Sequence, residues 1–323
     1  MLRLTVTTPS DLTDAATGIL SECEAVSTLS VSRGAALRPE GDVLHANVAR
    51  EAADAVVEQL RELGVPERGS IEIESVATWI SRPGYEADVL APGSSADAVV
   101  WPQVAHRSYE DTELNWTFLS FMTLATLIAA VAIVIDSQIL TIGAMVLGPE
   151  FGAVAALGLA LVRRRPLLLA AAVRALVVGF SVAIAVTTAF GLALRGLGWA
   201  TARTLVGPRP DTDFIYSPNK WSLIVAVLAA AAGVLSVTSG RTGGLNGVFI
   251  SVTTIPAAGN VALGLAFGQW GEVRGSGLQL IINLVGMGLA GWGTLALQRA
   301  LWSRVPAPRS RLAQHLHGGP PTR

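Results

Sequence analysis

Long apolar stretches occupy most of the chain after residue 115, and they restrict its possible folds more than any other property. A helix needs about 20 mostly apolar residues to cross the hydrocarbon core of a bilayer. Six stretches meet this length, at 116–135, 138–162, 166–194, 221–239, 244–268 and 276–300. The sequence therefore predicts an all-α membrane domain of six spans over residues 116–300. The third stretch exceeds the bilayer thickness, so we expect it to tilt or to extend past the lipid.

The composition agrees with a membrane protein and argues against an ordinary soluble enzyme. Hydrophobic residues make up 51% of the 323 residues and charged residues 15%, whereas a typical soluble domain has about 25% charged residues. The net charge of −1 gives no global basic field, so we do not expect nucleic acid as a partner. Cys23 is the single cysteine, which excludes an intrachain disulfide and a cysteine-based metal cluster. We expect no metal and no other cofactor.

Charge is distributed unevenly along the chain. Residues 1–95 carry a net charge of −8 and the remaining residues +7, which indicates an acidic soluble domain followed by the membrane domain. The first residues alternate like a strand and lack the apolar core of a signal peptide. We therefore expect no cleaved leader.

The first 79 residues are typical of a small α+β domain. Leu2, Leu4 and Val6 alternate with polar residues, as in a half-buried strand. Further patterns predict helices at 12–20 and 52–63, strands at 26–31, 43–48 and 71–75, and a turn at Gly41-Asp42. The resulting order βαββαβ is that of a ferredoxin-like fold, which hosts many functions. Residues 80–115 contain several Pro and Gly residues and are predicted to be a linker.

The distribution of arginine predicts the orientation of the membrane domain. Arg163, Arg164 and Arg165 lie in a short loop on the same predicted side as the basic tail at 301–323. Positive charge in short loops marks the cytoplasmic side of a membrane protein. We therefore expect a multi-pass protein of the plasma membrane with both termini in the cytoplasm.

The second and fifth spans share a sequence pattern. Pro149 and Pro256 each begin the pattern P-x-x-G-x-V-A, which L-G-L-A follows after a short gap. The pattern lies in the middle span of each group of three, so residues 116–194 and 221–300 are predicted to be two repeats. Because three is odd, the second repeat crosses the membrane in the inverted orientation. Inverted repeats with helices interrupted at matching places are typical of transporters that bind solute near the bilayer midplane.

The two prolines and the glycines that follow them are candidates for a solute pathway. Each proline lacks a backbone donor and obstructs the carbonyl four residues earlier, which must then find another partner. A broken helix also has ends whose partial charges can hold a solute. Gly152 and Gly259, three residues after the prolines, leave room for a close approach. The alternative is a pair of simple kinks that only shape helix packing.

Polar residues inside the spans extend this candidate pathway. Glu150 and Arg174 have similar predicted depths, and an unpaired charge there costs at least ~2.5 kcal/mol, so we expect an ion pair between them. The alternative is that Glu150 faces polar groups of a neighbouring span while Arg174 reaches the membrane surface. Asn260 and Asn283 complete the candidate pathway, although polar residues in spans also serve helix packing. We expect no catalytic residue.

The last predicted span carries a stripe of small residues that could form a helix–helix contact surface. Gly286, Ala290 and Thr294 recur every four residues. Such a stripe allows close contact between helices, within one chain or between two copies. The stripe is therefore compatible with a homo-oligomer as well as with packing inside one chain.

One segment resembles a known family. The run from Asp136 to Pro149 has Asp-Ser at the end of the first span, followed by Ile-Gly-Ala-Met and a proline. It is similar to the signature of the domain-of-unknown-function 389 family, and residues 247–266 are similar to that family's second proline-containing helix. The resemblance covers about residues 105–300. It implies an uncharacterised bacterial membrane protein, in a family that often carries an N-terminal soluble region.

The resemblance has one departure and implies no activity. Gly148-Pro149-Glu150-Phe151-Gly152 stands where the family more usually has Ser/Ala-Pro-Leu-Met-Gly/Ala. Glu150 is therefore a feature of a subgroup rather than of the whole family.

Three functions are weighed against these observations. A transporter or channel for a small solute or ion, with the N-terminal domain as a cytoplasmic regulator, is favoured by the repeat. A membrane-anchored sensor or scaffold without transport activity is the alternative. An intramembrane enzyme is disfavoured, because the predicted spans contain no His or Cys and Glu150 is their single deep acidic residue.

Overall fold

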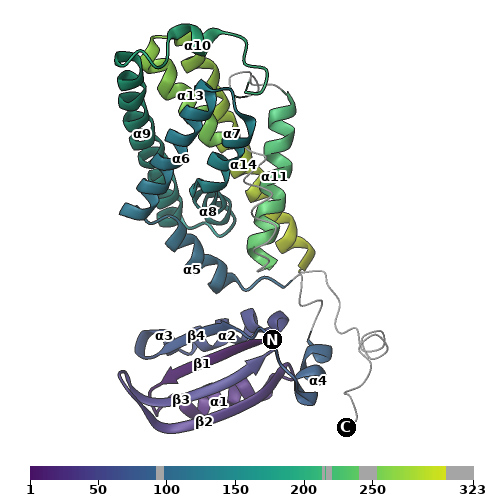
Figure 1. The fold of residues 1–323 in the computed structure, drawn as a ribbon. Helices are drawn as coiled ribbons and strands as arrows, with labels where there is room; N and C mark the ends of the chain where they lie inside the picture. The colour runs from purple at the N-terminus through teal and green to yellow at the C-terminus, as the bar shows by residue number, and fades with distance from the viewer. Residues whose placement is uncertain (92–97, 213–214, 216–219, 240–252, 303–323) are drawn as a thin grey trace. The chain divides into compact units, whose positions relative to one another are not determined.

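A computed structural model describes residues 1–91, 98–212, 215, 220–239 and 253–302 of the chain. The chain forms two compact units, one over Met1–Val104 and one over Ala105–Ala300 (Figure 1). The first unit contains a small antiparallel sheet, and the second is helical.

The first unit follows the predicted order of strands and helices. Its elements are β1 (Leu2–Thr8), α1 (Thr13–Glu22), β2 (Val26–Leu37), β3 (Glu40–Val48), α2 (Arg50–Glu62), α3 (Val65–Arg68), β4 (Ser70–Ser75) and α4 (Arg82–Leu90). The strands are antiparallel in the order β2-β3-β1-β4. The next helix is α5 (Trp101–Asp111), and the sequence boundary between the two units falls within it. The described part of the segment predicted to be a linker therefore contains two helices, α4 and α5.

The β2–β3 hairpin turns earlier than predicted. Leu37 pairs with Glu40, so the turn lies between these two residues and Gly41 is within β3. The backbone of Thr8 occupies the place where a Cβ atom on Gly41 would lie. Gly41 is thus a residue of close approach between β1 and β3, and the predicted turn at residues 41–42 is wrong.

The core of the first unit lies between the sheet and its helices. Leu2, Leu4 and Val6 of β1 are buried, and they pack with Leu20 of α1 and Leu60 of α2. Full burial of an aliphatic side chain of this size contributes roughly 1.5–3 kcal/mol. The alternation in β1 therefore fixes which face of the sheet the helices cover.

The second unit consists of helices with local signals at several ends. The helices are α6 (Trp116–Val134), α7 (Gln138–Leu147), α8 (Glu150–Val162), α9 (Pro166–Gly196), α10 (Ala202–Val206), α11 (Lys220–Ser239), α13 (Thr254–Phe267) and α14 (Trp270–Trp302). The Asn115 side chain accepts the Phe118 N–H at 2.8 Å and caps α6. The Ser137 hydroxyl accepts the Leu140 N–H at 3.3 Å and caps α7. Both satisfy a donor that the first helical turn leaves without an intrahelical partner.

Three helices in the described part of the chain are long and apolar enough to cross a membrane. They are α6, α9 and the Trp270–Ala300 part of α14. The pair α7 and α8, bent by 53° at the break between them, provides a fourth candidate span. The apolar parts of α11 and α13, Leu223–Thr238 and Thr254–Phe267, are shorter. The described residues thus contain three or four candidate spans where the sequence predicts six, and residues 240–252 of the predicted fifth span lie outside them.

The break between α7 and α8 has a local cause. Gly148 is extended, with φ −69° and ψ 129°, as expected for a residue that precedes proline. Pro149 then stands at the N-cap of α8. Proline cannot supply the N–H that would continue α7, so the helix ends and a new one begins in another direction.

Close packing and outward apolar surface characterise the helical unit. A Cβ atom on Gly259 of α13 would lie 3.2 Å from Ala129 Cβ and from Ala130 N of α6, so these helices approach closely. Large apolar residues also face outward, including Ile139 and Leu167, which are more than four-fifths exposed. A soluble protein rarely exposes so much apolar surface, which supports a membrane location for this unit.

Candidate functional site

The N-terminal ends of α8 and α13 meet inside the helical unit. Glu150 is the first residue of α8 and Thr254 is the first residue of α13. The Thr254 hydroxyl donates to Glu150 Oε1 at 2.6 Å, although the two residues are 104 positions apart. A Cβ atom on Gly148 would lie 2.7 Å from Ile255 Cγ1. The structure therefore brings together the two segments that contain Pro149 and Pro256.

Glu150 is buried and only half satisfied. Glu150 is 5% exposed, and its Oε2 atom has no hydrogen-bond partner among the described residues. Oε2 lies directly beside Gly148, at the place where a side chain on that residue would begin. Gly148 thus provides room for the carboxylate as well as the end of α7.

The predicted ion pair between Glu150 and Arg174 is wrong. Arg174 is exposed on α9, while the carboxylate binds Thr254. The 53° bend between α7 and α8 explains the difference, because it places the start of α8 against α13. A depth calculation along one straight helix could not include that bend.

A polar stripe on α14 faces α13. Its four members are spaced by four, three and four residues, which places them on one side of a helix. They are Glu272, Ser276, Gln279 and Asn283. Ser276, Gln279 and Asn283 are at most 1% exposed. The stripe is therefore a buried polar surface within an apolar helix, and it lies close to the two helix N-termini.

At the Asn283 end of the stripe, the side-chain amides of Gln279 and Asn283 bond to Thr253, the residue that precedes α13. Asn283 Nδ2 donates to Thr253 Oγ1 at 3.1 Å, and Gln279 Nε2 donates to the same oxygen at 3.3 Å. Gln279 Oε1 has no hydrogen-bond partner among the described residues. Thr253 and Thr254 are adjacent, so they connect the stripe to Glu150.

At the other end of the stripe, Asn260 joins a buried ion pair. Arg209 Nη2 lies 3.0 Å from Glu272 Oε2, and Arg209 Nη1 donates to Asn260 Oδ1 at 3.2 Å. Asn260 Nδ2 in turn donates to Glu272 Oε2 at 2.7 Å and to Ser276 Oγ at 2.8 Å. This network joins the segment before α11 to α13 and α14.

The remaining predicted pathway residues have packing roles near the site. Pro256 lies in the first turn of α13 and is buried, where its missing N–H costs the helix nothing. Gly152 is in the first turn of α8, and a Cβ atom there would lie 2.7 Å from the side chain of Asp111. Gly259 is the close contact with α6 described above. Val252, the residue four positions before Pro256, lies outside the described residues.

Four residues of this site were missed by sequence reasoning. Arg209 and Glu272 lie in predicted loops, and Ser276 and Gln279 lie in the last span. The helical spacing of Glu272, Ser276, Gln279 and Asn283 was a usable signal for one polar face. No sequence pattern connects Arg209 to that face.

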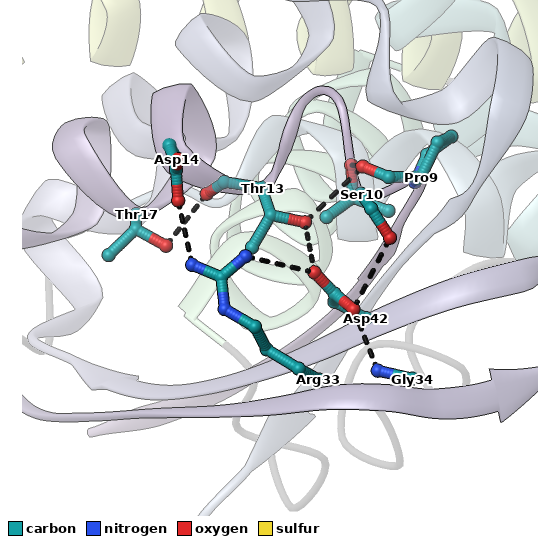
Figure 2. A network of polar contacts seen from close by, with 9 residues as sticks. Pro9, Ser10, Thr13, Asp14, Thr17, Arg33, Gly34 and Asp42 are labelled. Atoms are coloured by element: carbon teal, nitrogen blue, oxygen red, sulfur yellow. Dashed lines mark hydrogen bonds and ion pairs between the residues drawn. The ribbon is translucent and has the colours of Figure 1, made fainter.

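The first unit has its own polar network, which ties the hairpin to α1 (Figure 2). Asp42 Oδ2 accepts the Thr13 hydroxyl at 2.7 Å, and Asp42 Oδ1 accepts the Gly34 N–H at 2.7 Å. Arg33 lies 3.6 Å from Asp42 and 2.8 Å from Asp14. The hydrogen bonds from Gly34 and then from Thr13 hold the pKa of Asp42 below its ordinary value.

The exposed face of the sheet carries a polar hollow. It is lined by Arg3, Thr5, Thr28, Ser30, His45, Asn47 and Glu74. Thr5 Oγ1 and His45 Nδ1 are hydrogen-bonded at 3.2 Å. In the described part of the chain, no group of three or more His, Cys, Asp or Glu residues is arranged to hold a metal ion.

Comparison with known proteins places the site within one family domain. Residues 145–289 match the family model described as a domain of unknown function (DUF389). The match begins in α7 and includes α8, α13 and α14 as far as Leu289, so the matched region contains the whole polar stripe and both helix N-termini. No curated protein and no solved structure matches the chain.

Proposed function

We propose that the protein is a membrane transporter or channel whose solute passes between the N-termini of α8 and α13. The observation that carries this proposal is the hydrogen bond between Glu150 and Thr254, which joins the starts of two helices within an apolar bundle. Discontinuous helices whose ends meet in this way are the usual solute sites of secondary transporters. The expected substrate is a small solute or ion.

The polar stripe on α14 supplies the second argument. From Glu272 to Asn283 it extends 11 residues, or roughly 16 Å at 1.5 Å per residue. Buried polar side chains in a membrane domain are costly and usually mark substrate or ion pathways. The stripe begins at the Arg209–Glu272 ion pair and ends at Thr253, beside the helix N-termini. We take it as one wall of the pathway, with the ion pair closing one end.

The proposed topology has six spans in two inverted repeats, with both termini in the cytoplasm of a bacterial cell. The support is the matched position of Pro149 before α8 and Pro256 at the start of α13. In this arrangement each proline-containing segment comes from the opposite side of the bilayer. Cysteine labelling tests the orientation, because Ser310→Cys should be inaccessible to a membrane-impermeant reagent in intact cells.

The first unit is proposed to be a ferredoxin-like regulatory domain. Its order βαββαβ and its strand order β2-β3-β1-β4 support that fold. The polar hollow around His45 gives such a domain a place for a ligand. The same observation favours the second candidate function, in which the protein is a membrane-anchored sensor or scaffold. We propose no enzymatic activity for either unit.

Flux measurements in liposomes test the proposal. Purified protein is reconstituted and screened with labelled inorganic ions and small organic solutes. The transport hypothesis expects uptake of at least one solute, and Thr254→Val should reduce that uptake because it removes the donor between α8 and α13. Ligand binding at the hollow, without any flux, would favour the sensor instead.

A further inference from the structure

We propose that the site between α8 and α13 takes a small inorganic anion, and that the Glu150 carboxylate is a tethered anion that occupies this site until the free anion displaces it. The inference names the substrate class of the proposed pathway and so rests on the proposed function. It is carried by the convergence of two helix N-termini on one buried, half-satisfied carboxylate.

Charge balance at the site favours an anion over a cation. The N-terminus of a helix carries a partial charge of about +0.5, so α8 and α13 together provide about +1. An ionised Glu150 balances that charge. A cation bound beside Glu150 would leave a net charge of about +1 in an apolar bundle. An anion that replaces the carboxylate at the two N-termini preserves neutrality there, with the displaced carboxylate moving to water or taking up a proton. Burying an uncompensated charge costs several kcal/mol, so exchange of one anion for another is the favoured event.

The available hydrogen-bond donors also suit an anion. Thr254 donates its hydroxyl to Glu150 and can donate it to another anion in the same place. Thr253 Oγ1 accepts N–H groups from Gln279 and Asn283, which leaves its own hydrogen as a donor. The first turns of α8 and α13 add backbone N–H groups.

The carboxylate is held weakly enough to leave. Oε1 accepts one hydroxyl, while Oε2 has no hydrogen-bond partner among the described residues and lies beside Gly148. A carboxylate with an unsatisfied buried oxygen is an expensive occupant. An anion that reaches more of the surrounding donors competes with it favourably.

Asp111 provides a control that separates anion binding at the Glu150 site from a general electrostatic attraction. Its side chain lies against Gly152 in the first turn of α8, so it is a second carboxylate at the same helix end. Asp111 is an exposed residue, whereas Glu150 is buried. Removing that charge changes the local field without opening the donors that Glu150 occupies.

Chloride-dependent stability of the full-length protein in detergent tests the binding step. Chloride is replaced by gluconate at constant ionic strength, and the midpoint of thermal unfolding is followed. In E150Q, chloride should raise the midpoint by about 2 °C or more over gluconate, because a ligand that binds the native state stabilises it. The wild type and D111N should respond less. T254V in the E150Q background should reduce the shift, and E150A replaces E150Q if the glutamine variant does not fold.

Flux in proteoliposomes tests the anion site separately from the proposed transport function. E150Q should take up chloride several-fold faster than the wild type or D111N, with sodium uptake unchanged. A chloride-insensitive E150Q, or one that gains sodium uptake instead, overturns the anion site. Thr254-dependent transport of a cation or neutral solute would support the proposed transport function and reject the anion site. Chloride binding without flux in any variant would support the anion site and reject the transport function.

Discussion

Arg209 and Glu272 form an ion pair at 3.0 Å, with side chains that are 3% and 12% exposed. They are 63 residues apart in the sequence, and Asn260 bonds to both. Two opposite charges in a buried position are stable only together, because each alone would keep its full desolvation cost. The pair therefore fixes the segment around residue 209 against the start of α14.

Breaking this pair from one side should be more harmful than removing it. Arg209→Leu leaves Glu272 buried without its counter-charge, and we expect a loss of about 3–5 kcal/mol of stability. Glu272→Leu should cost a similar amount. The double variant should lose clearly less than the sum of the two, as measured by unfolding of the full-length protein in detergent. Strictly additive losses would contradict an energetic coupling between the two side chains.

The stripe on α14 should affect flux separately from stability. Asn283→Leu removes the amide that donates to Thr253 at 3.1 Å. We expect a loss of about 1–3 kcal/mol in stability and a reduced flux of the solute that liposome screening identifies. Flux is measured per folded protein, after size-exclusion chromatography.

A matched variant is available on the same helix. Gln298 Nε2 donates to Thr238 of α11 at 3.2 Å, which is another amide bond between helices. Gln298→Leu should lower stability to a similar degree and leave flux per folded protein unchanged. Equal effects of the two variants on flux would show that the stripe has a packing role alone.

Close packing of α8 against α14 should be sensitive to one methyl group. A Cβ atom on Gly158 would lie 2.9 Å from Gly291 C and Trp292 N, both backbone atoms that cannot move independently. Gly158→Ala should therefore destabilise the helical unit by about 1–3 kcal/mol. Gly143→Ala in α7 is the control, because no atom lies within 4 Å of its Cβ position. This second change should be neutral or stabilising by up to about 1 kcal/mol, as read from the midpoint of unfolding.

Local chemistry made part of this structure predictable. The alternation of Leu2, Leu4 and Val6 gave the covered face of the sheet, and the elements of the first unit follow in the predicted order. The break before α8 follows from the chemistry of Pro149 alone. The repeat made Pro149 and Pro256 candidates for one solute pathway, and the segments that contain them meet at Glu150 and Thr254.

Contacts that depend on direction or on distant segments were not predictable. The partner of Glu150 follows from the 53° bend after α7, and composition does not encode the angle of a bend. Arg209 lies in a polar segment that has no periodic pattern, so its burial against Glu272 had no sequence signal. The count of spans also depended on length alone, and α13 has 14 residues where the sequence predicts a full span.

The Asp42 network makes the first unit sensitive to acid. The Gly34 N–H and the Thr13 hydroxyl hold the pKa of Asp42 below its ordinary value of 3.8. Because the folded state favours the ionised carboxylate, the network's contribution to stability is complete above pH 3.8 and is lost as the pH falls through the lowered pKa. Asp42→Asn should remove this dependence and loosen the connection between β2, β3 and α1 at neutral pH as well.

Hydrogen exchange of the full-length protein, followed on peptides from β2 and β3, measures this effect. Exchange rates corrected for intrinsic chemistry should rise in the wild type as the pH falls below 3.8, whereas Asp42→Asn should exchange faster already at pH 6 and change less with acid. Asp14→Asn is the matched control, since Asp14 also pairs with Arg33 but its side chain is 85% exposed. An exposed pair contributes about 0–1 kcal/mol, so this control should behave like the wild type. If Asp14→Asn reproduced the effect of Asp42→Asn, the ion pair with Arg33 would stabilise the hairpin, and the hydrogen bonds from Gly34 and Thr13 would not.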